Sequence, residues 1–565
     1  MKKIKRIIKN KTIKKRKLDK KDIISKILPY IILALNLFVL ISYITGPALE
    51  YLNSDCVDSL LWSKVIVDSG KILAEDFYYA AILPFGSPLW MVPIIKIFGY
   101  TMLSQTISMV IFSIIFTFSA YFLFKSLKWN NLESSIGTFI LCMFLSSSTK
   151  LREIMWEHVI YYSLGVLLVM LLTGLVIRLL DYNSNNKKKP KKEIKKYILM
   201  GVLLLISIGC AVDGMQMIAL TVAPVAGSLI ACIFFDEKTD INSNKNSKII
   251  MTVMILITGL SIGLITLIII TKFGKISAGY ANSYTSWSSI DTWKEHLALF
   301  LESYLTLFGI EPNPKIVMTS LISFPIILKL ISSLIVLICP FLLLLNYKKL
   351  SERNDKLLSG IFLIIFLVIM FGFICGKLSE ANWRLTPLLG ISVIETLVYI
   401  RNLIKEKKVK RRSGIVLVII LTITSLFISI SIQVIPRNEW KNVPLQKVAD
   451  MLISKGYNNG YATFWNAGEL MLRSNDRIQI ANIKIENKKI EPQKYQSLKK
   501  WYLDIPGNNR YFVILDYNEY QQISKSKEWL KLCDTNGVVE QFTIENYVIT
   551  VFKKNIFTKD ILDES

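Results

Sequence analysis

Histidine and closely spaced cysteine are scarce in this chain. Among 565 residues there are two histidines, and no two of the seven cysteines form a C-x-x-C pair. Zinc sites and disulfide frameworks are recognised from such clusters, so the sequence indicates neither. No internal repeat is present, and low-complexity sequence is confined to lysine-rich loops. The missing repeat matters because many transporters are built from duplicated halves.

Acidic residues are few beside basic ones. The chain has 42 Asp and Glu against 68 Lys and Arg, which gives a net charge of +26. An excess of this size is common in proteins that bind nucleic acid. Here the basic residues lie in short tails and loops between apolar runs, and this distribution argues against a nucleic-acid partner.

Long apolar runs, in contrast, are abundant. Hydrophobic residues make up 52% of the chain, and the mean hydropathy is +0.44. A helix that spans a bilayer needs about 20 predominantly apolar residues. The predicted fold is therefore an all-α polytopic membrane bundle of about eleven transmembrane helices, at 28–45, 102–124, 132–148, 159–180, 197–214, 216–235, 249–271, 317–346, 358–375, 384–400 and 413–435.

The distribution of basic residues predicts how the bundle is oriented. Residues 1–26 carry thirteen Lys or Arg, and no small-residue cleavage site follows the first apolar run. We therefore expect an uncleaved first span with a cytoplasmic tail. The loops placed inside by this orientation hold 23 Lys and Arg, whereas the outer loops, including 47–90 and 272–316, hold 9 over a greater length. This asymmetry predicts a multi-pass protein of the cell membrane with a cytoplasmic N-terminus.

After the module at 27–435, the chain changes character. Residues 436–565 contain no spanning run, and the topology places them outside. Segments YATFWNAG, RYFVILDY and NYVITVF are rich in β-branched and aromatic residues and are predicted to be strands. Residues 443–455 and 518–532 are predicted to be helical. We expect a small extracytoplasmic α/β or α+β domain that contacts the acceptor or caps the site.

The first outer loop, 47–90, is too polar to cross a bilayer. Between Glu50 and Trp90 it holds six acids and two bases. Asp55 and Asp58 are three residues apart, so on a helix they share one face, and Gly70 is a plausible stop. Such an amphipathic helix is expected to lie in the membrane surface. The alternative is that Asp55 only complements a helix N-terminus, with Ser54 as the cap.

Further polar residues gather at the outer ends of the predicted spans. Polar groups in such places are costly and usually functional. Acids, cations and aromatic rings on one surface suit an anionic lipid headgroup and a sugar. Each residue also has a structural alternative, such as a hydrogen bond at the interface, a polar turn or a snorkelling side chain. The candidate binding residues are Glu157, His158, Tyr161, Asp213, Gln216, Lys272 and Arg384.

The layout of residues 25–435 resembles the GT-C class of membrane glycosyltransferases, in the branch of protein O-mannosyltransferases and the lipid A aminoarabinose transferase. The motifs that carry the resemblance are NSDCVD in the first outer loop, EHVIYY in the second and NWRLTP at a late span. The resemblance implies that a first-loop acid, Asp55 or Asp58, is the catalytic base. It also implies that cations, here Arg384 and Lys272, hold the polyprenyl phosphate of the donor.

The sequence departs from the family in the spacing of its acids. Relatives usually carry an Asp-Glu pair in the first loop, whereas here the pattern is Asp-x-x-Asp, which leaves open which aspartate is the base. Metal-using members show Asp-x-Asp, so we expect no obligatory metal, and no cofactor is indicated.

Three functions follow from these patterns. The first is a transferase that moves a sugar from a polyprenyl-phosphate-linked donor in the membrane lipid to an envelope acceptor. The second is a transporter or flippase of a lipid-linked glycan, and the third is a non-catalytic membrane protein that binds envelope glycans. Transporters place polar groups near the bilayer midplane, whereas the central parts of these spans are nearly free of ionisable residues. The sided distribution therefore favours the enzyme.

Overall fold

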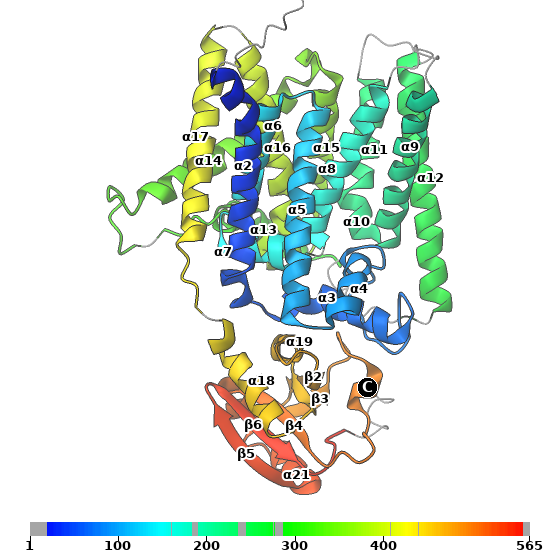
Figure 1. Cartoon of the computed structure of the whole chain (residues 1–565), viewed down its shortest axis with the longest axis vertical. Coiled ribbons are helices and arrows are strands. Elements are labelled where there is room, and N and C mark those ends of the chain that lie inside the picture. The colour runs from blue at the N-terminus through cyan, green and yellow to red at the C-terminus, as the bar shows by residue number, and fades with distance from the viewer. Residues whose placement is uncertain are drawn as a thin grey trace, which may run out of the picture.

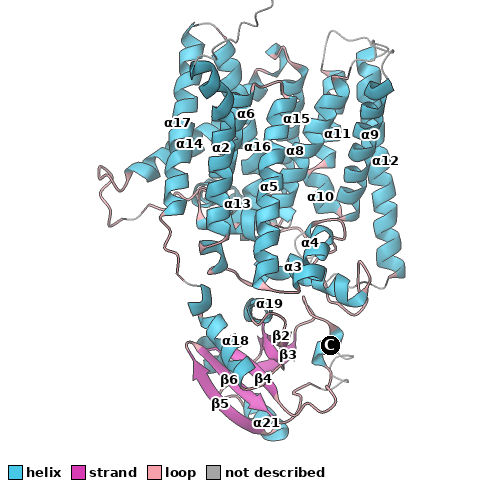
Figure 2. Ribbon diagram, viewed as in Figure 1, coloured by secondary structure: helices cyan, strands magenta, loops and turns pink. Residues whose placement is uncertain are grey.

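A bundle of long helices and a C-terminal domain containing a β-sheet form the two ends of the molecule (Figures 1 and 2). The structure is a computed structural model. It describes residues 20–557, except 160, 183–189, 236–243, 275, 277–285, 313, 407 and 439.

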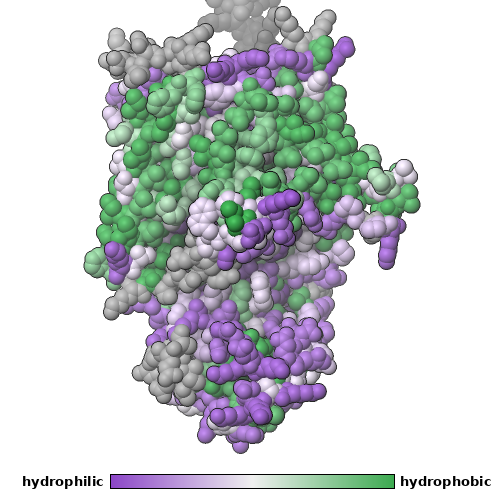
Figure 3. All heavy atoms as spheres, turned by 180° about the vertical axis from the view of Figure 1, so that it is seen from behind, coloured by the Kyte–Doolittle hydropathy of each residue, from purple (hydrophilic) through white to green (hydrophobic). Residues whose placement is uncertain are grey.

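Ten helical segments of the described chain are long and apolar enough to cross a membrane, which makes this a multi-pass membrane protein. On the face that Figure 3 shows, the bundle carries a broad hydrophobic band, with hydrophilic side chains above and below it. The bundle is built from α2 (Lys20–Ile44), α5 (Met102–Ser126), α6 (Asn131–Phe144), α8 (Tyr161–Leu180), α9 (Pro190–Val212), α10 (Met215–Leu220), α11 (Val222–Phe234), α12 (Asn244–Phe273), α14 (Phe324–Leu345), α15 (Arg353–Ile374), α16 (Thr386–Lys405) and α17 (Lys408–Gln433).

One predicted span, 132–148, is not among these ten. It corresponds to α6, which has only 14 residues. At 1.5 Å per residue it is about 21 Å long, shorter than a typical spanning helix. Near its start, Glu133 lies 3.4 Å from Arg401 at the end of α16. Beyond its other end, Glu153 meets the first loop through Asn53. The described chain therefore has ten long candidate spans and one short, largely buried helix that runs between the two ends of the bundle.

Most predicted span boundaries differ from the observed helix ends by a few residues, and two of these differences concern the residues before a span. The span predicted at 317–346 begins later, at Phe324, and turns precede it. The span predicted at 159–180 begins at Tyr161, because Val159 adopts a left-handed conformation (φ 48°) that no helix continues through.

Several shorter elements cover the face of the bundle that carries the C-terminal domain (Figure 1). They come from loops far apart in the sequence. The elements are α3 (Ser54–Ser69), α4 (Ser87–Phe98), α7 (Thr149–Arg152), the π-helix η2 (Glu153–His158), α13 (Trp293–Leu307) and the 3₁₀ turn η6 (Asn382–Leu385).

The C-terminal domain contains a mixed six-stranded sheet in the order β3-β2-β1-β4-β6-β5. Strand β1 pairs in parallel with β2 and β4, and the other pairs are antiparallel. The strands are β1 (Asn459–Thr463), β2 (Gln479–Glu486), β3 (Lys489–Pro492), β4 (Tyr511–Asp516), β5 (Val538–Ile544) and β6 (Tyr547–Phe552), and the helices are α18 (Pro444–Ser454), α19 (Phe464–Arg473), α20 (Tyr517–Ile523) and α21 (Lys527–Asn536).

One predicted strand of this domain is wrong in its second half. The strand predicted from YATFWNAG ends at Thr463, and α19 begins at the next residue. From there the buried residues, Ala467, Leu470 and Met471, follow helical spacing and no longer alternate. Strands β2, β3 and β5 were not predicted, because charged residues interrupt their apolar pattern.

Helix α3 lies between the bundle and the C-terminal domain, rather than with its apolar side in the membrane surface as predicted. Its residues Val57, Leu60 and Leu61 are all buried. Helix α19 packs against it so closely that a Cβ on Gly468 would lie 3.2 Å from the Val57 side chain. The predicted amphipathic helix is therefore enclosed by protein, and its polar groups must find partners there.

Candidate functional site

The start of α3 is fixed by Asn53, and not by Ser54, which was the cap in the alternative interpretation of Asp55. The Asn53 side-chain oxygen accepts a hydrogen bond from the Cys56 amide at 3.1 Å, which makes Asn53 the N-cap. Its Nδ2 donates to Glu153 Oε1 at 3.2 Å. One side chain thus sets the register of α3 and ties it to the second outer loop.

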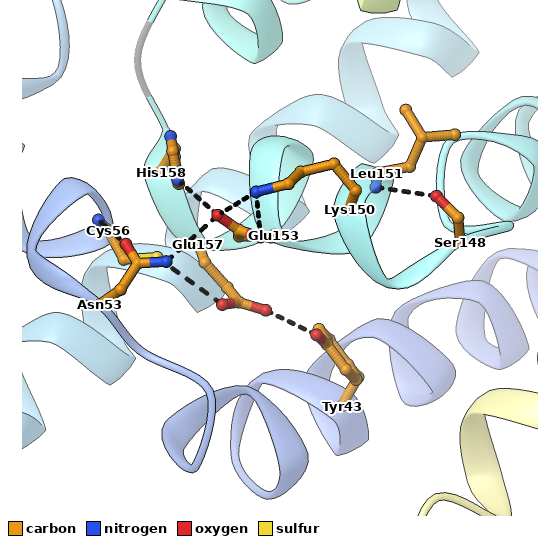
Figure 4. Close-up of polar contacts among 9 residues, drawn as sticks. All are labelled: Tyr43, Asn53, Cys56, Ser148, Lys150, Leu151, Glu153, Glu157 and His158. Carbon is orange, nitrogen blue, oxygen red and sulfur yellow. Dashed lines mark hydrogen bonds and ion pairs between the residues drawn. The ribbon is translucent and has the colours of Figure 1, made fainter. Parts of the chain in front are cut away.

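On the second outer loop, Glu153 is the centre of a cluster of polar side chains that includes Lys150 and His158 (Figure 4). Its two carboxylate oxygens lie 2.9 and 2.7 Å from Lys150 Nζ, and Oε1 lies 3.1 Å from His158 Nε2. Burial alone would raise its pKa, but the hydrogen bonds and charges of His158 and Lys150 lower it to about 2. Glu153 is therefore a permanent anion between two basic side chains.

Asp55 stands in the first turn of α3 beside this group and is half-buried. Its pKa is raised, chiefly by burial, while His158 lowers it, Glu153 raises it and Lys150 lowers it again. Burial thus outweighs the stabilisation of the anion expected at a helix N-terminus. A carboxylate in this position is a stronger base than one in water and remains partly accessible.

Asp58, one turn later, has a different environment. It is buried, and its Oδ2 accepts a hydrogen bond from Gln496 Nε2 at 2.6 Å. Burial raises its pKa well above the usual value, and the charge of Asp55 raises it further. The two aspartates share a helix face, as predicted, but Asp58 points at a side chain of the C-terminal domain.

Arg384 lies near the second loop, in η6 directly before α16. It is buried in η6, where its guanidinium donates to the Lys377 carbonyl and lies 3.6 Å from Glu380 Oε2. The neighbouring Trp383 ring lies 4.5 Å from Lys150 Nζ, a cation–π contact that joins this turn to the second loop.

Tyr162 links these residues to another hairpin. Its hydroxyl forms hydrogen bonds with Arg384 and Gln216, and the charge of Asp55 acts on it electrostatically. Gln216 itself is exposed, in the first turn of α10. Asp55, Arg384 and Gln216, which are predicted from three separate motifs, are thus brought into one neighbourhood.

Glu157 and Asp213 have structural partners. Glu157 is buried, accepts a hydrogen bond from the Tyr43 hydroxyl at 2.5 Å and lies 3.8 Å from Cys56 Sγ. Burial raises its pKa to about 7. Asp213 is also buried and accepts from the Phe85 amide at 2.8 Å, and burial raises its pKa to about 7. Both carboxyls hold the first loop against the bundle.

Two predicted binding residues are placed elsewhere or not described. Lys272 is exposed in the last turn of α12, a helix that packs mainly on α9 and α11, and no described contact joins it to Arg384. Tyr161 is the first residue of α8, and its side chain lies outside the described part of the structure.

Three possible metal ligands lie close together in the described chain. One ligand atom from each of Cys56, Glu153 and His158 lies within 4.8 Å of the other two, and zinc takes such donors. Lys150 already contacts both Glu153 oxygens, so a metal ion would have to compete with its ammonium group. The expectation of no obligatory metal stays a prediction.

Several residues of this site were missed by sequence reasoning. Glu153 and Lys150 have a local sequence signal, because both lie shortly before the Glu157–His158 pair in KLREIMWEH. No local sequence signal points to Gln496, since 438 residues separate it from Asp58.

Comparison with solved structures identifies the fold of this chain. Neither a protein-family model nor a curated protein sequence matches the chain. The crystal structure of ArnT from Cupriavidus metallidurans bound to undecaprenyl phosphate matches with a TM-score of 0.51 at 9% identity, covering 94% of this chain and 98% of that chain. The apo oligosaccharyltransferase of Archaeoglobus fulgidus gives 0.45 at 8% identity, covering 92% and 74%. The fold is therefore that of the GT-C membrane glycosyltransferases, ArnT-like with a mixed-sheet C-terminal domain, as the sequence predicted.

Proposed function

We propose that this protein is a membrane glycosyltransferase that moves a sugar from a polyprenyl-phosphate donor to an acceptor hydroxyl outside the cytoplasm. The observation that carries the proposal is the grouping of half-buried Asp55 with Lys150, His158 and buried Arg384 on one face of the bundle. A base and cations side by side are what transfer from a lipid phosphate needs. The donor class is supported by the ArnT structure, which holds undecaprenyl phosphate in the same fold.

The proposed orientation follows from the basic loops. Lys128, Asp181, Arg353 and Arg401 lie at the end of the bundle opposite the C-terminal domain, and the loops there are rich in Lys and Arg. By the positive-inside rule this end is cytoplasmic. The candidate site then faces outward, where nucleotide sugars are absent and a lipid-linked donor is required.

The proposed reaction is an inverting displacement. The acceptor oxygen forms a bond to the anomeric carbon while the bond from that carbon to the phosphate oxygen breaks. Asp55 takes the acceptor proton as the new bond forms, so its raised pKa favours the step. The departing polyprenyl phosphate gains negative charge, which Arg384 stabilises as a fixed cation.

A transporter has less support. It would need polar groups along a path through the membrane. In the described bundle, Glu395 is a buried carboxyl at the middle of α16, and Ser359 donates to it at 3.4 Å. A single carboxyl that bonds to the neighbouring helix serves interhelical packing and marks no path.

A pair of variants tests the proposal. Asp55→Asn keeps the shape and removes the base, so the transfer rate should fall by about 10²–10⁴-fold while binding of undecaprenyl phosphate is unchanged. Arg384→Ala should weaken that binding about tenfold or more, and Arg384→Lys should restore it only in part. The substrate for the rate measurement is the polyprenyl-linked sugar that accumulates in membranes lacking the protein. Normal turnover of Asp55→Asn with that donor would refute the role of Asp55.

A further inference from the structure

A buried polar cluster joins α3 to the C-terminal domain. It consists of Trp62, Gln496 and Asp58, each of which is no more than 5% exposed. Trp62 Nε1 donates to Gln496 Oε1 at 2.6 Å, and Gln496 Nε2 donates to Asp58 Oδ2 at 2.6 Å. An indole N–H can only donate, so it fixes the orientation of the amide and directs the NH₂ group at the aspartate. The three side chains therefore form one ordered chain of hydrogen bonds.

The backbone around Gln496 is fastened to the first outer loop. Gln496 N donates to the Tyr78 carbonyl at 2.7 Å, and Tyr78 N donates to the Ser497 carbonyl at 2.9 Å. Next to them, Phe77 and Leu498 form an antiparallel bridge. Gln496 also adopts a left-handed conformation, with φ 48°, which is costly for a residue other than glycine. The surrounding contacts hold it there.

This cluster and the candidate base occupy adjacent turns of one helix. Asp58 follows Asp55 by three residues and lies on the same face. At the N-terminus, α3 is held by the bond from Asn53 to Glu153, and one turn later by the bond from Gln496 to Asp58. Two attachments on different loops fix both the position and the rotation of the helix. The direction in which Asp55 points depends on both.

We propose that Gln496 is a positioning residue for the transfer reaction: by holding Asp58 it sets the rotation of α3 and so aims Asp55 at the acceptor. This inference rests on the proposed function. Gln496 lies in the C-terminal domain, so the domain completes the site without performing chemistry. Asp58 is then an anchor of the helix, and Asp55 alone is the base.

A swap of the two side chains tests the proposal. Gln496→Glu alone places two carboxyls against each other and should lower kcat at least about tenfold, with little change in undecaprenyl phosphate binding. In the double variant Asp58→Asn with Gln496→Glu, Trp62 and the new amide both donate to the new carboxylate. The double variant should recover most of the lost kcat. Failure of the swap to recover kcat when α3 is properly folded would overturn the inference.

Hydrogen exchange of the full-length protein supplies a readout that does not depend on turnover. Peptides covering Ser54–Ser69 should exchange faster in Gln496→Glu and return to wild-type rates in the double variant. Gln522→Ala, an exposed glutamine of α20 in the same domain, is the matched control and should change neither exchange nor kcat. Wild-type exchange and wild-type kcat in Gln496→Glu would also overturn the inference.

The outcomes separate this inference from the proposed function. If Asp55→Asn is inactive and Gln496→Glu is fully active, the base assignment survives and the positioning role fails. If Asp55→Asn is fully active, the assignment of Asp55 as the base fails, and the positioning role fails with it. If the wild-type protein transfers no sugar from the polyprenyl-linked donor, the proposed function itself fails. If Asp58→Asn alone abolishes turnover and the swap does not restore it, Asp58 is the base and Gln496 does not act as proposed.

Discussion

Glu153 shows how single residues organise the candidate site. It accepts hydrogen bonds from Asn53 and Lys150 and pairs with His158, so the first and second outer loops meet on one carboxylate. Its low pKa of about 2 keeps it charged at every physiological pH. Because Glu153 raises the pKa of Asp55 while Lys150 and His158 lower it, the proton affinity of the candidate base depends on the balance within this group.

That balance predicts a pH shift. Lys150→Met removes a cation that lowers the pKa of Asp55, so this pKa should rise further above its ordinary value. A base acts in its ionised form, and the acid limb of the kcat/KM profile should therefore move to higher pH. Lys349→Met, an exposed lysine at the opposite end of the bundle, should leave the profile in place. An unchanged or acid-shifted limb in Lys150→Met would contradict this account of Asp55.

At the scale of elements, α3 and α19 form the joint between bundle and domain. Gly468 permits their close approach, since a Cβ there would meet Val57 at 3.2 Å and Ser54 Oγ at 3.3 Å. Around this contact, Arg473 donates to the Leu49 carbonyl at 3.1 Å, and Lys64 pairs with Asp476 at 2.8 Å. The joint is thus both packed and hydrogen-bonded.

A single larger side chain at Gly468 should separate α19 from α3. Gly468→Val adds a branched group between two packed helices and should destabilise the protein by about 1–3 kcal/mol. We expect a lower midpoint of thermal unfolding in detergent and slower turnover, because α3 carries the candidate base. Gln521→Val, at an exposed position of α20, is the control for the added side chain. Equal unfolding midpoints for both variants and the wild type would mean that α19 and α3 tolerate separation.

On the scale of the whole molecule, the first and last helices of the bundle place its two chain ends on opposite faces (Figure 1). Helix α2 begins at the face with the basic loops, and α17 ends at the face that carries the C-terminal domain. The sequence predicted that this domain contacts the acceptor or caps the site. The contacts of Gln496, Gly468 and Asp476 with the first loop make it part of the same unit.

The orientation is testable by labelling. The labelling uses a variant in which the two cysteines that are not buried in the described structure are replaced, Cys375→Ser and Cys533→Ser. Lys531→Cys, exposed on α21, should then react with a membrane-impermeant maleimide in intact cells. Lys349→Cys should react only after the membrane is opened. The reverse pattern would invert the proposed topology and remove the argument for a lipid-linked donor.

The sequence by itself determined the membrane architecture and the side on which polar residues gather. Both depend on local sequence, because the bilayer demands an apolar run in each span and the positions of the basic loops predict the direction of each span. It also indicated the helix at Asp55, with Gly70 as its left-handed C-cap (φ 68°). The short α6 and the partition of YATFWNAG between strand and helix were misjudged, because their lengths are set by packing.

Only the tertiary structure decided which polar residues meet. It brought Asp55, Arg384 and Gln216 together and placed Lys272 at the end of a different helix pair. It also distinguished Asp55 from Asp58, which look equivalent in the sequence. That distinction comes from Gln496, 438 residues away from Asp58. Such a contact leaves no periodicity or spacing in the sequence, since it depends on how the C-terminal domain packs against the first loop.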